Sequence, residues 1–213
     1  MKNVIFLDLD GVIFDSYDLW DTAVAKFLNL AGISYTSEIK AELWQLNMVE
    51  AERYLEQLFL TKNVSYRPEV LQTALVLLYE KVPLMTDAKA VLADLAQQGY
   101  QLYAVTSNHY HLAEIGLKSR QLFPYFTAIY SCLAMGYDGK EEAFLQAILT
   151  KERLKAKQVI FVEDSISNLK MAKKLGIAGI YLENQDNPQN EEKRNITTIR
   201  SLKELSNLVK EIK

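Results

Sequence analysis

Cysteine is almost absent from this 213-residue chain, in which Cys132 is the only one. No intrachain disulfide can form, which excludes the disulfide-rich scaffolds of small secreted proteins. Long apolar runs are also missing, since the longest, Ala74 to Tyr79, has six residues, against the roughly 18 needed to span a bilayer. The N-terminal stretch MKNVIFLDLD lacks the apolar segment and cleavage site of a signal peptide. We therefore expect a cytoplasmic protein.

An excess of positive charge is missing as well. The 24 Lys and Arg residues stand against 27 Asp and Glu, a formal net charge of −3. Without a basic block, the chain is a poor match for a protein that binds nucleic acid or anionic membranes. Its 49% hydrophobic and 24% charged residues are ordinary for a globular protein and argue against a disordered or fibrous chain. Nothing in the sequence distinguishes a monomer from a homodimer.

The spacing of apolar residues changes along the chain. Asn3 to Leu7 is a short β-branched and aromatic run that ends in Asp-Leu-Asp-Gly, which predicts a buried strand followed by a tight turn. From Tyr17 to Lys81 apolar residues recur at helical spacing, which indicates three helices and no strand. Gly32 is expected to end the first of them, and Pro68 to open the third.

The rest of the chain alternates between the two patterns. Strands are expected at 100–105, 128–131, 158–162 and 178–182, with helices between them and a last helix at 201–212. This alternation predicts an α/β fold with a doubly wound, mostly parallel, Rossmann-like sheet. The predicted core comprises residues 1–15 and 83–213, and an all-α cap domain of residues 16–82 is inserted into it.

Polar residues cluster where three of the predicted strands end. These clusters are Asp8 with Asp10, then Thr106-Ser107-Asn108, then Glu163-Asp164, and Lys140 lies between the last two. Each taken alone has an ordinary interpretation as a turn residue, a helix cap or a surface charge. Since ligands bind at the carboxyl ends of parallel strands, three such clusters are expected to meet in one crevice.

The chemistry of such a crevice follows from its residue types. Asp8, Asp10 and Asp164 would bring carboxylates close together, an arrangement that is costly without a cation, and hard oxygen ligands suit Mg²⁺. With Lys140 and the Thr106 hydroxyl, the cluster suits a phosphoryl group. One carboxylate can attack as a nucleophile, and another two residues along can act as general acid and base.

This pattern resembles the haloacid dehalogenase-like superfamily of phosphatases, and in particular members with a helical cap after the first motif. The resemblance rests on four segments in order: VIFLDLDGVIFDS (Val4 to Ser16), LYAVTSN (Leu102 to Asn108), Lys140 in GKEEAF, and VIFVEDSISN (Val159 to Asn168). It covers essentially the whole chain. It implies a Mg²⁺-dependent phosphatase that hydrolyses a small phosphorylated metabolite through an aspartyl-phosphate.

The resemblance also implies roles for the acidic residues. Asp8 would be the nucleophile, and Asp10 the general acid and base, with its backbone carbonyl on the metal. Asp164 would complete the Mg²⁺ site, and Glu163 would lie beside the metal or bind it occasionally. Asn168 stands where many relatives have a further acid.

The remaining motif residues would contact the phosphate. Thr106 would hold the transferring phosphoryl group, and Lys140 would neutralise both the nucleophile and the phosphate. Ser107 and Asn108 would add further hydrogen-bond donors. In the family the motif Lys is usually followed by Pro, whereas here Glu141 follows.

Other functions stay open at this point. A phosphosugar mutase uses the same chemistry, although the stretch Leu43 to Glu50 lacks the glycine expected of a mutase cap. A dehalogenase would need neither Asp10 nor the metal, and a phosphonate hydrolase would add a cap lysine. A catalytically silent phosphate-binding or regulatory protein on the same fold is the alternative from another class.

Some aromatic and histidine residues fall outside these motifs. Trp20, Trp44 and Tyr54 are expected in the core of the helical segment. His109 and His111 form an H-x-H pair after the second motif and are expected at the rim of the crevice, where His109 would be able to touch a substrate.

Overall fold

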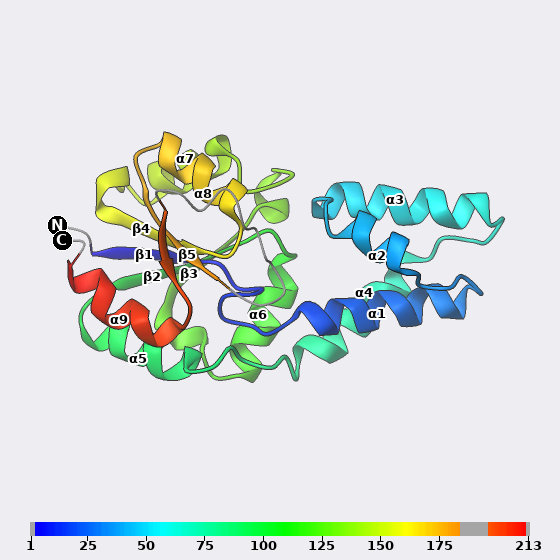
Figure 1. The fold of residues 1–213 in the computed structure, drawn as a ribbon, viewed down its shortest axis with the longest axis horizontal. Helices are drawn as coiled ribbons and strands as arrows, with labels where there is room; N and C mark the ends of the chain where they lie inside the picture. Colours follow the sequence, from blue (N-terminus) through cyan, green and yellow to red (C-terminus); the bar gives the residue numbers. More distant parts are fainter. Residues whose placement is uncertain (1–2, 184–195, 212–213) are drawn as a thin grey trace.

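The computed structural model of the protein describes residues 3–183 and 196–211. Its centre is a parallel sheet of six strands in the order β3-β2-β1-β4-β5-β6 (Figure 1). The strands are β1 (Val4–Leu7), β2 (Gln101–Thr106), β3 (Phe126–Ser131), β4 (Val159–Glu163), β5 (Ala178–Leu182) and β6 (Thr197–Ile199). The predicted doubly wound α/β fold is confirmed.

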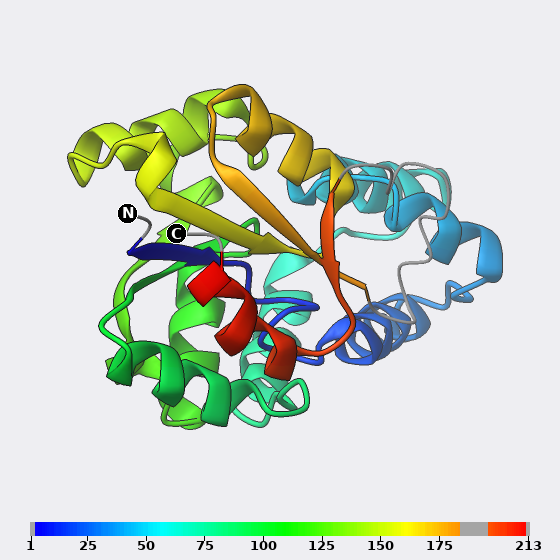
Figure 2. The same cartoon turned by 60° about the vertical axis from the view of Figure 1, so that its left-hand side comes forward.

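Strand β1 lies in the middle of the sheet, and all four of its residues are buried. Because successive side chains of a strand point to opposite faces, it supplies both halves of the core. Val4 and Phe6 pack in one cluster with helices α7 and α8, and Ile5 and Leu7 pack in the other with α5, α6 and α9. Figure 2 shows these two helical layers on either side of the sheet. The helices are α5 (Ala88–Gln97), α6 (Tyr110–Ser119), α7 (Glu142–Lys151), α8 (Ile166–Lys174) and α9 (Leu202–Glu211).

Four further helices between β1 and α5 form a helical insert, here defined as residues 17–79, which extends to one side of the sheet (Figure 1). They are α1 (Tyr17–Leu30), α2 (Ser37–Leu43), α3 (Met48–Thr61) and α4 (Pro68–Tyr79). Phe27 of α1 stacks on Phe59 of α3 with ring centroids 4.8 Å apart, and Tyr66 packs edge-on against both. The insert therefore has an aromatic core of its own. Among the described residues, no helix has the length and apolar character needed to cross a membrane.

The two chain segments that join the insert to the sheet run side by side. The backbone N–H of Asp15 donates to the carbonyl of Pro83 (3.0 Å), and that of Met85 donates to Ile13 (2.9 Å). Where the chain enters and leaves the insert, it is thus held as one short hydrogen-bonded pair.

One α-helix and one strand were not predicted from the sequence. Helix α2 begins after the N-cap Thr36, whose side chain accepts a hydrogen bond from the backbone N–H of Ile39. The helix is short and buries none of its residues, so its sequence lacks the apolar stripe by which buried helices are recognised. Strand β6 has three residues, of which only Ile199 is buried. Such a short edge strand lacks the apolar run by which strands are recognised.

Candidate active site

The three predicted polar clusters meet at the carboxyl end of the sheet. Asp8 follows β1, Thr106 ends β2, and Glu163 ends β4, and each of the three is buried. Parallel pairing holds the strand ends level, since Leu7 lies opposite both Ala104 and Val162. The sheet therefore places these side chains at one edge, as open parallel sheets do for their ligands.

Lys140 reaches this edge from the loop before α7. Its Nζ lies 2.6 Å from Oδ1 of Asp8 and 2.7 Å from Oε2 of Glu163, and its side chain is 1% exposed. Burial lowers the pKa of Lys140, but the two carboxylates outweigh it and hold that pKa above its usual value. The ammonium thus stays charged and neutralises part of the acidic cluster.

Three carboxyl groups lie close together at this edge of the sheet. One oxygen from each of Asp8, Glu163 and Asp164 lies within 4.8 Å of the others. Burial, reinforced by the charge of Glu163, raises the pKa of Asp8 well above its usual value. Burial and the charge of Asp8 raise the pKa of Asp164 to about 6. Lys140 balances only one of the three negative charges.

This set of oxygens fits a divalent cation. Oε1 of Glu163 accepts from the backbone N–H groups of Asp164 and Ser165, at 3.2 and 3.1 Å, while Oε2 is held by Lys140. Asp8 and Asp164 therefore remain the principal candidate ligands. Glu163 instead holds Lys140 and the backbone of Asp164 in place. Hard, anionic oxygen donors of this kind suit Mg²⁺, and a cation would relieve the repulsion that raises the pKa values of both carboxyl groups.

Tyr17, which opens α1, also reaches the acidic cluster, a contact that was not predicted. Its hydroxyl donates to Oδ2 of Asp164. Both lie against Gly11, which has φ +79°, and a Cβ there would overlap the Asp164 carboxylate and the Tyr17 hydroxyl. Only glycine fits at this turn, because it has both the required backbone conformation and no side chain.

Asp10 lies on the side of the site that faces the insert. Its Oδ1 accepts from Ser16 Oγ (2.6 Å) and from the Tyr79 hydroxyl, and its Oδ2 accepts from Asn108 Nδ2 (3.0 Å). The Tyr79 hydroxyl in turn accepts from Trp20 Nε1 at 2.9 Å. Asp10 is thus held by donors from the first loop, from α4 and from the loop after β2.

The loop after β2 carries the predicted phosphate-binding residues. Oγ1 of Thr106 accepts from the backbone N–H of Asn108 (3.0 Å), and Oδ1 of Asn108 accepts from the N–H of His109 (2.7 Å). The Asn108 carbonyl is fixed by Ser131 Oγ at 2.7 Å. Thr106, Ser107 and Asn108 all line the cavity described next.

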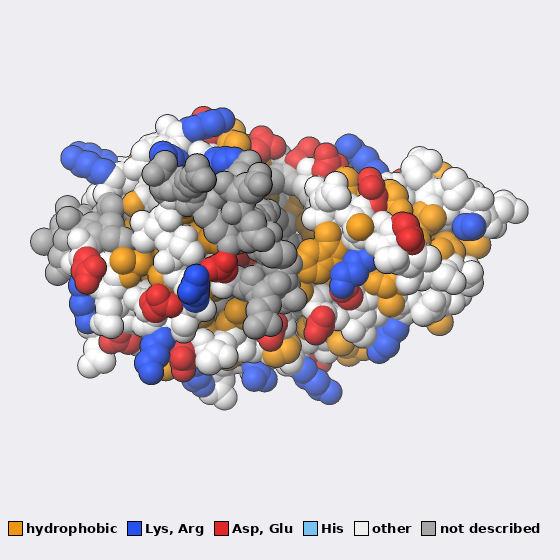
Figure 3. Space-filling view, viewed as in Figure 1, with side chains coloured by type: hydrophobic (Ala, Val, Ile, Leu, Met, Phe, Trp, Pro, Cys, Tyr) orange, Lys and Arg blue, Asp and Glu red, His pale blue; other side chains and the backbone are white. Residues whose placement is uncertain are grey.

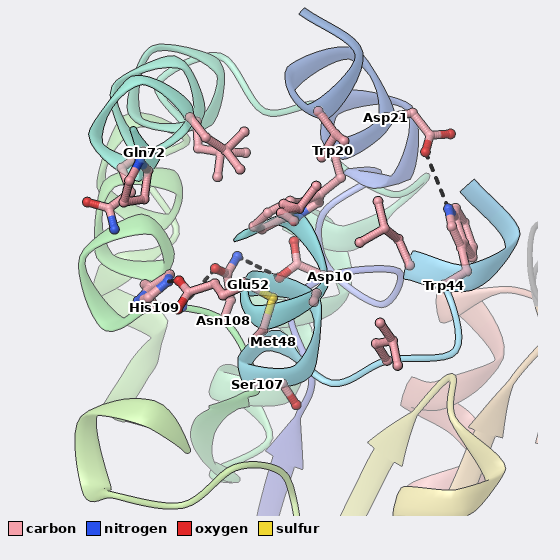
Figure 4. A pocket seen from close by; sticks show the side chains of 18 of the residues that line it. Asp10, Trp20, Asp21, Trp44, Met48, Glu52, Gln72, Ser107, Asn108 and His109 are labelled. Atoms are coloured by element: carbon pink, nitrogen blue, oxygen red, sulfur yellow. Dashed lines mark hydrogen bonds and ion pairs between the residues drawn. The ribbon is translucent and has the colours of Figure 1, made fainter. Parts of the chain in front are cut away.

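A cavity of about 290 Å³ separates the sheet edge from the insert. Asp8, Asp10 and the Thr106–Asn108 loop form one end, and side chains of the insert form the remaining wall. Figure 4 shows Asp10 and Asn108 at that end with Trp20 beside them, and Trp44 and Asp21 farther along the wall. In Figure 3, hydrophobic side chains gather on the insert beside its junction with the sheet.

The structure brings together all eight predicted site residues: Asp8, Asp10, Thr106, Ser107, Asn108, Lys140, Glu163 and Asp164. It differs from prediction for Trp20 and Trp44, which line the cavity instead of lying wholly in a core. Tyr54 is not among the lining residues. Ser16, Tyr17 and Tyr79 were not predicted; only Ser16 lies inside a recognised motif.

The two histidines differ from each other. His109 precedes α6 and lines the cavity, with its Nε2 3.7 Å from Oε1 of Glu52. His111 lies one residue into α6, and its ring centroid is 5.6 Å from that of His109. Two other lysines between the second and fourth motifs make contacts elsewhere: Lys118 pairs with Glu114 on α6, and Lys151 lies over the Tyr130 ring.

Residues 4–181 match the family model of the haloacid dehalogenase-like hydrolases. The chain belongs to this family, as its fold and strand-end motifs indicate. No curated protein sequence matches it.

Several solved structures share the fold. CbbY from Rhodobacter sphaeroides, in complex with phosphate, has a TM-score of 0.81 at 17% identity over 96% of both chains. YfnB from Bacillus subtilis, described as a HAD-hydrolase and bound to magnesium, has a TM-score of 0.78 at 20% identity over 98% of this chain and 99% of its own. A protein predicted to be a phosphoglycolate phosphatase, from Haemophilus somnus, has a TM-score of 0.78 at 18% identity over 98% of both chains.

Proposed function

We propose that the protein is a Mg²⁺-dependent phosphatase that hydrolyses a small phosphate monoester through an aspartyl-phosphate. The observation that carries the proposal is the position of Lys140 between Asp8 and Glu163, beside Asp164. A buried carboxylate with a lysine at one oxygen, and an acidic cluster suited to a cation, matches the needs of phosphoryl transfer.

In the proposed first step Asp8 attacks the phosphorus of the ester. Lys140 and the backbone N–H of Leu9 hold Oδ1 of Asp8, at 2.6 and 2.8 Å, so Oδ2 is the oxygen that forms the new bond. The bond between phosphorus and the leaving oxygen breaks, and Asp10 gives its proton to that oxygen. Mg²⁺, held by Asp8 and Asp164, would neutralise charge on the phosphoryl oxygens.

In the second step water replaces the carboxylate. Asp10, now ionised, takes a proton from the attacking water, and the phosphorus–Oδ2 bond breaks to restore Asp8. Thr106 and Ser107, which both line the cavity, hold the phosphoryl oxygens in both steps. The donors that hold Asp10, from Ser16 and Asn108, keep its carboxylate within the site between the two proton transfers.

The cavity supports a small substrate. At about 290 Å³ it lies at the lower end of small-molecule pockets, which span roughly 300–1,000 Å³. It is bounded by the insert on the side away from the sheet, so a folded phosphoprotein would not reach Asp8 in this conformation.

The test is release of inorganic phosphate from phenyl phosphate by the full chain, with Mg²⁺ and with a chelator. We expect activity only with Mg²⁺, and none in Asp8→Asn, which keeps the side-chain shape but removes the nucleophile. Absence of turnover in folded wild-type protein that binds Mg²⁺ would overturn the proposal. Phosphate transfer to a second sugar phosphate, with slow release to water, would indicate a mutase.

A further inference from the structure

The wall of the cavity opposite the acidic cluster is mostly apolar. It comes from all four helices of the insert and from the loops between them. Its aliphatic and aromatic members include Val24, Leu46, Leu71, Trp20, Tyr35 and Trp44. Some of this surface meets water in this structure, since Leu46 is half-buried and Trp44 is exposed. An apolar group placed against them would remove that surface from water.

Cations are missing from this wall. Within the described part of the chain, no Lys or Arg lines the cavity, and its charged residues are Asp8, Asp10, Asp21 and Glu52. Lys40 lies nearby but is paired with Asp21. A second phosphate or a carboxylate on the substrate would face acidic and apolar groups, and burying such a charge without a partner is unfavourable.

His109 does not supply the missing charge. Burial lowers its pKa below the usual value despite the opposing effect of Glu52, so the ring is mainly neutral near pH 7. It offers a hydrogen bond to an uncharged group, and the exposed Gln72 amide lies at the same side of the cavity (Figure 4). These polar groups suit a hydroxyl or an amide of the leaving group.

The aromatic side chains are held in place before any ligand binds. Trp20 Nε1 donates to Tyr79, which fixes its ring beside Asp10. Trp44 packs on Tyr17 with ring centroids 5.0 Å apart, and its Nε1 lies 3.3 Å from Asp21 Oδ1. Such rings present flat apolar surface at little cost in side-chain entropy.

We propose that the substrate is the phosphate monoester of an uncharged, largely apolar alcohol of about one ring in size. This inference rests on the proposed phosphatase activity and names its substrate class. The proposed size follows from the cavity of about 290 Å³, which is small among ligand pockets of roughly 300–1,000 Å³. The phosphoryl group takes part of that space. Esters with a second anionic group, such as bisphosphates and phosphorylated carboxylic acids, are poor substrates.

The test compares three phosphate monoesters on the full chain with Mg²⁺: phenyl phosphate, 4-carbamoylphenyl phosphate and 4-carboxyphenyl phosphate. The last two have nearly the same shape and differ in charge. We expect kcat/KM to be at least about tenfold higher for the carbamoyl ester, because only the carboxylate is left unpaired. Similar kcat/KM values for this pair would overturn the inference but leave the phosphatase proposal standing. Failure of all three esters would count against the phosphatase proposal itself.

A second test adds a positive charge to the apolar wall of the cavity. Leu46→Lys puts a cation on the apolar wall, and we expect it to raise the carboxy-to-carbamoyl ratio of kcat/KM at least about tenfold. Leu60→Lys is the matched control, because Leu60 is 60% exposed and outside the cavity lining, and its ratio should equal that of the wild type. Both esters are assayed on one preparation, so the ratio does not depend on the folded fraction. An unchanged ratio in Leu46→Lys would contradict the placement of the leaving group.

Binding can be followed without turnover. The chain has two tryptophans, and both line the cavity. In Asp8→Asn with Mg²⁺, we expect cyclohexyl phosphate to change the tryptophan fluorescence saturably and inorganic phosphate to change it much less. Equal changes from both ligands would show that the leaving group does not reach the wall, and would contradict the inference.

Discussion

The hydroxyl of Tyr79, in the last turn of α4, donates a hydrogen bond to Oδ1 of Asp10, although 69 positions separate the two residues in the chain. Tyr79 is fully buried, and its ring packs edge-on against Phe14 and Trp20. The helical insert therefore contributes to the proposed proton-transfer site as well as to the cavity wall. Tyr79 acts as a positioning residue for Asp10.

Removal of this hydroxyl should affect turnover more than binding. We expect Tyr79→Phe to lower kcat about tenfold or more while KM for phenyl phosphate changes little, because Asp10 loses a donor but the cavity keeps its shape. The unfolding free energy should fall by about 1–2 kcal/mol, the cost of leaving buried partners unsatisfied. Tyr110→Phe, at an exposed tyrosine, is the control. A rise in KM with kcat preserved would contradict the positioning role.

Loss of Lys140 should destabilise the protein strongly. Lys140→Met leaves Asp8 and Glu163 without their ion-pair partner in a buried site, and breaking such a pair costs about 3–5 kcal/mol. Urea denaturation without Mg²⁺ measures this loss. Adding Glu163→Gln should restore part of the stability, because one of the unbalanced charges is removed.

The matched control for that measurement is Lys174→Met. Lys174 pairs with Glu142 at 2.7 Å, but both side chains are exposed, and such surface pairs contribute about 0–1 kcal/mol. Equal losses in Lys140→Met and Lys174→Met would show that the buried pairing contributes no special stability.

Mg²⁺ should stabilise the folded chain through the acidic cluster. A ligand that binds only the native state raises stability by about 2.7 kcal/mol at 100 times its dissociation constant. We expect Mg²⁺ to raise the melting temperature of the wild type, and Asp164→Asn to reduce that rise to near zero. Asp87→Asn, an exposed site away from the cluster, should respond as the wild type does. A full Mg²⁺ response in Asp164→Asn would place the metal elsewhere.

Alanine substitutions at Gly11 and Gly99 can distinguish the cost of a strained backbone from the cost of a steric overlap. Both have positive φ, +79° and +85°, but a Cβ at Gly99 meets nothing within 4 Å, whereas one at Gly11 overlaps Asp164 and Tyr17. Gly99→Ala should cost about 1–2 kcal/mol from conformation alone. Gly11→Ala should cost more and should also weaken the Mg²⁺-dependent rise in melting temperature. If the two substitutions had equal effects on the unfolding free energy and on the Mg²⁺-dependent rise in melting temperature, the overlap at Gly11 would contribute nothing.

The strand-end residues were predictable because their signals are local. A buried strand followed by acids or by Thr-Ser-Asn places its polar residues at the carboxyl edge, whatever the rest of the chain does. Asp8, Asp10 and Asp164 were found in this way, as were the sheet and most helices. Lys140 was noted for its place between two of these clusters, and the family pattern supported it, since its loop carries no periodic signal.

The contributions of the insert were not predictable, because its polar contacts come from residues that count as apolar in a periodicity analysis. Tyr79 closes the run that begins at Ala74, and its ring is indeed buried, so nothing in the pattern marks its hydroxyl as a donor to Asp10. The sequence likewise does not show whether Trp20 and Trp44 pack in the core of the insert or line the cavity. Which face of a helix lines a cavity depends on how the helices pack, and spacing alone leaves that undetermined.

The paired connections at Asp15 and Pro83 have a consequence for how enzymes of this shape diversify. Because the insert departs from and returns to the sheet at one hydrogen-bonded point, another helical segment whose ends meet at the same spacing can replace it without shifting the register of β1. Such an exchange would change the cavity wall and leave Asp8 and Lys140 in place. The incoming segment would also need a hydrogen-bond donor to Asp10 equivalent to the Tyr79 hydroxyl. Its other residues would be free to line a different cavity.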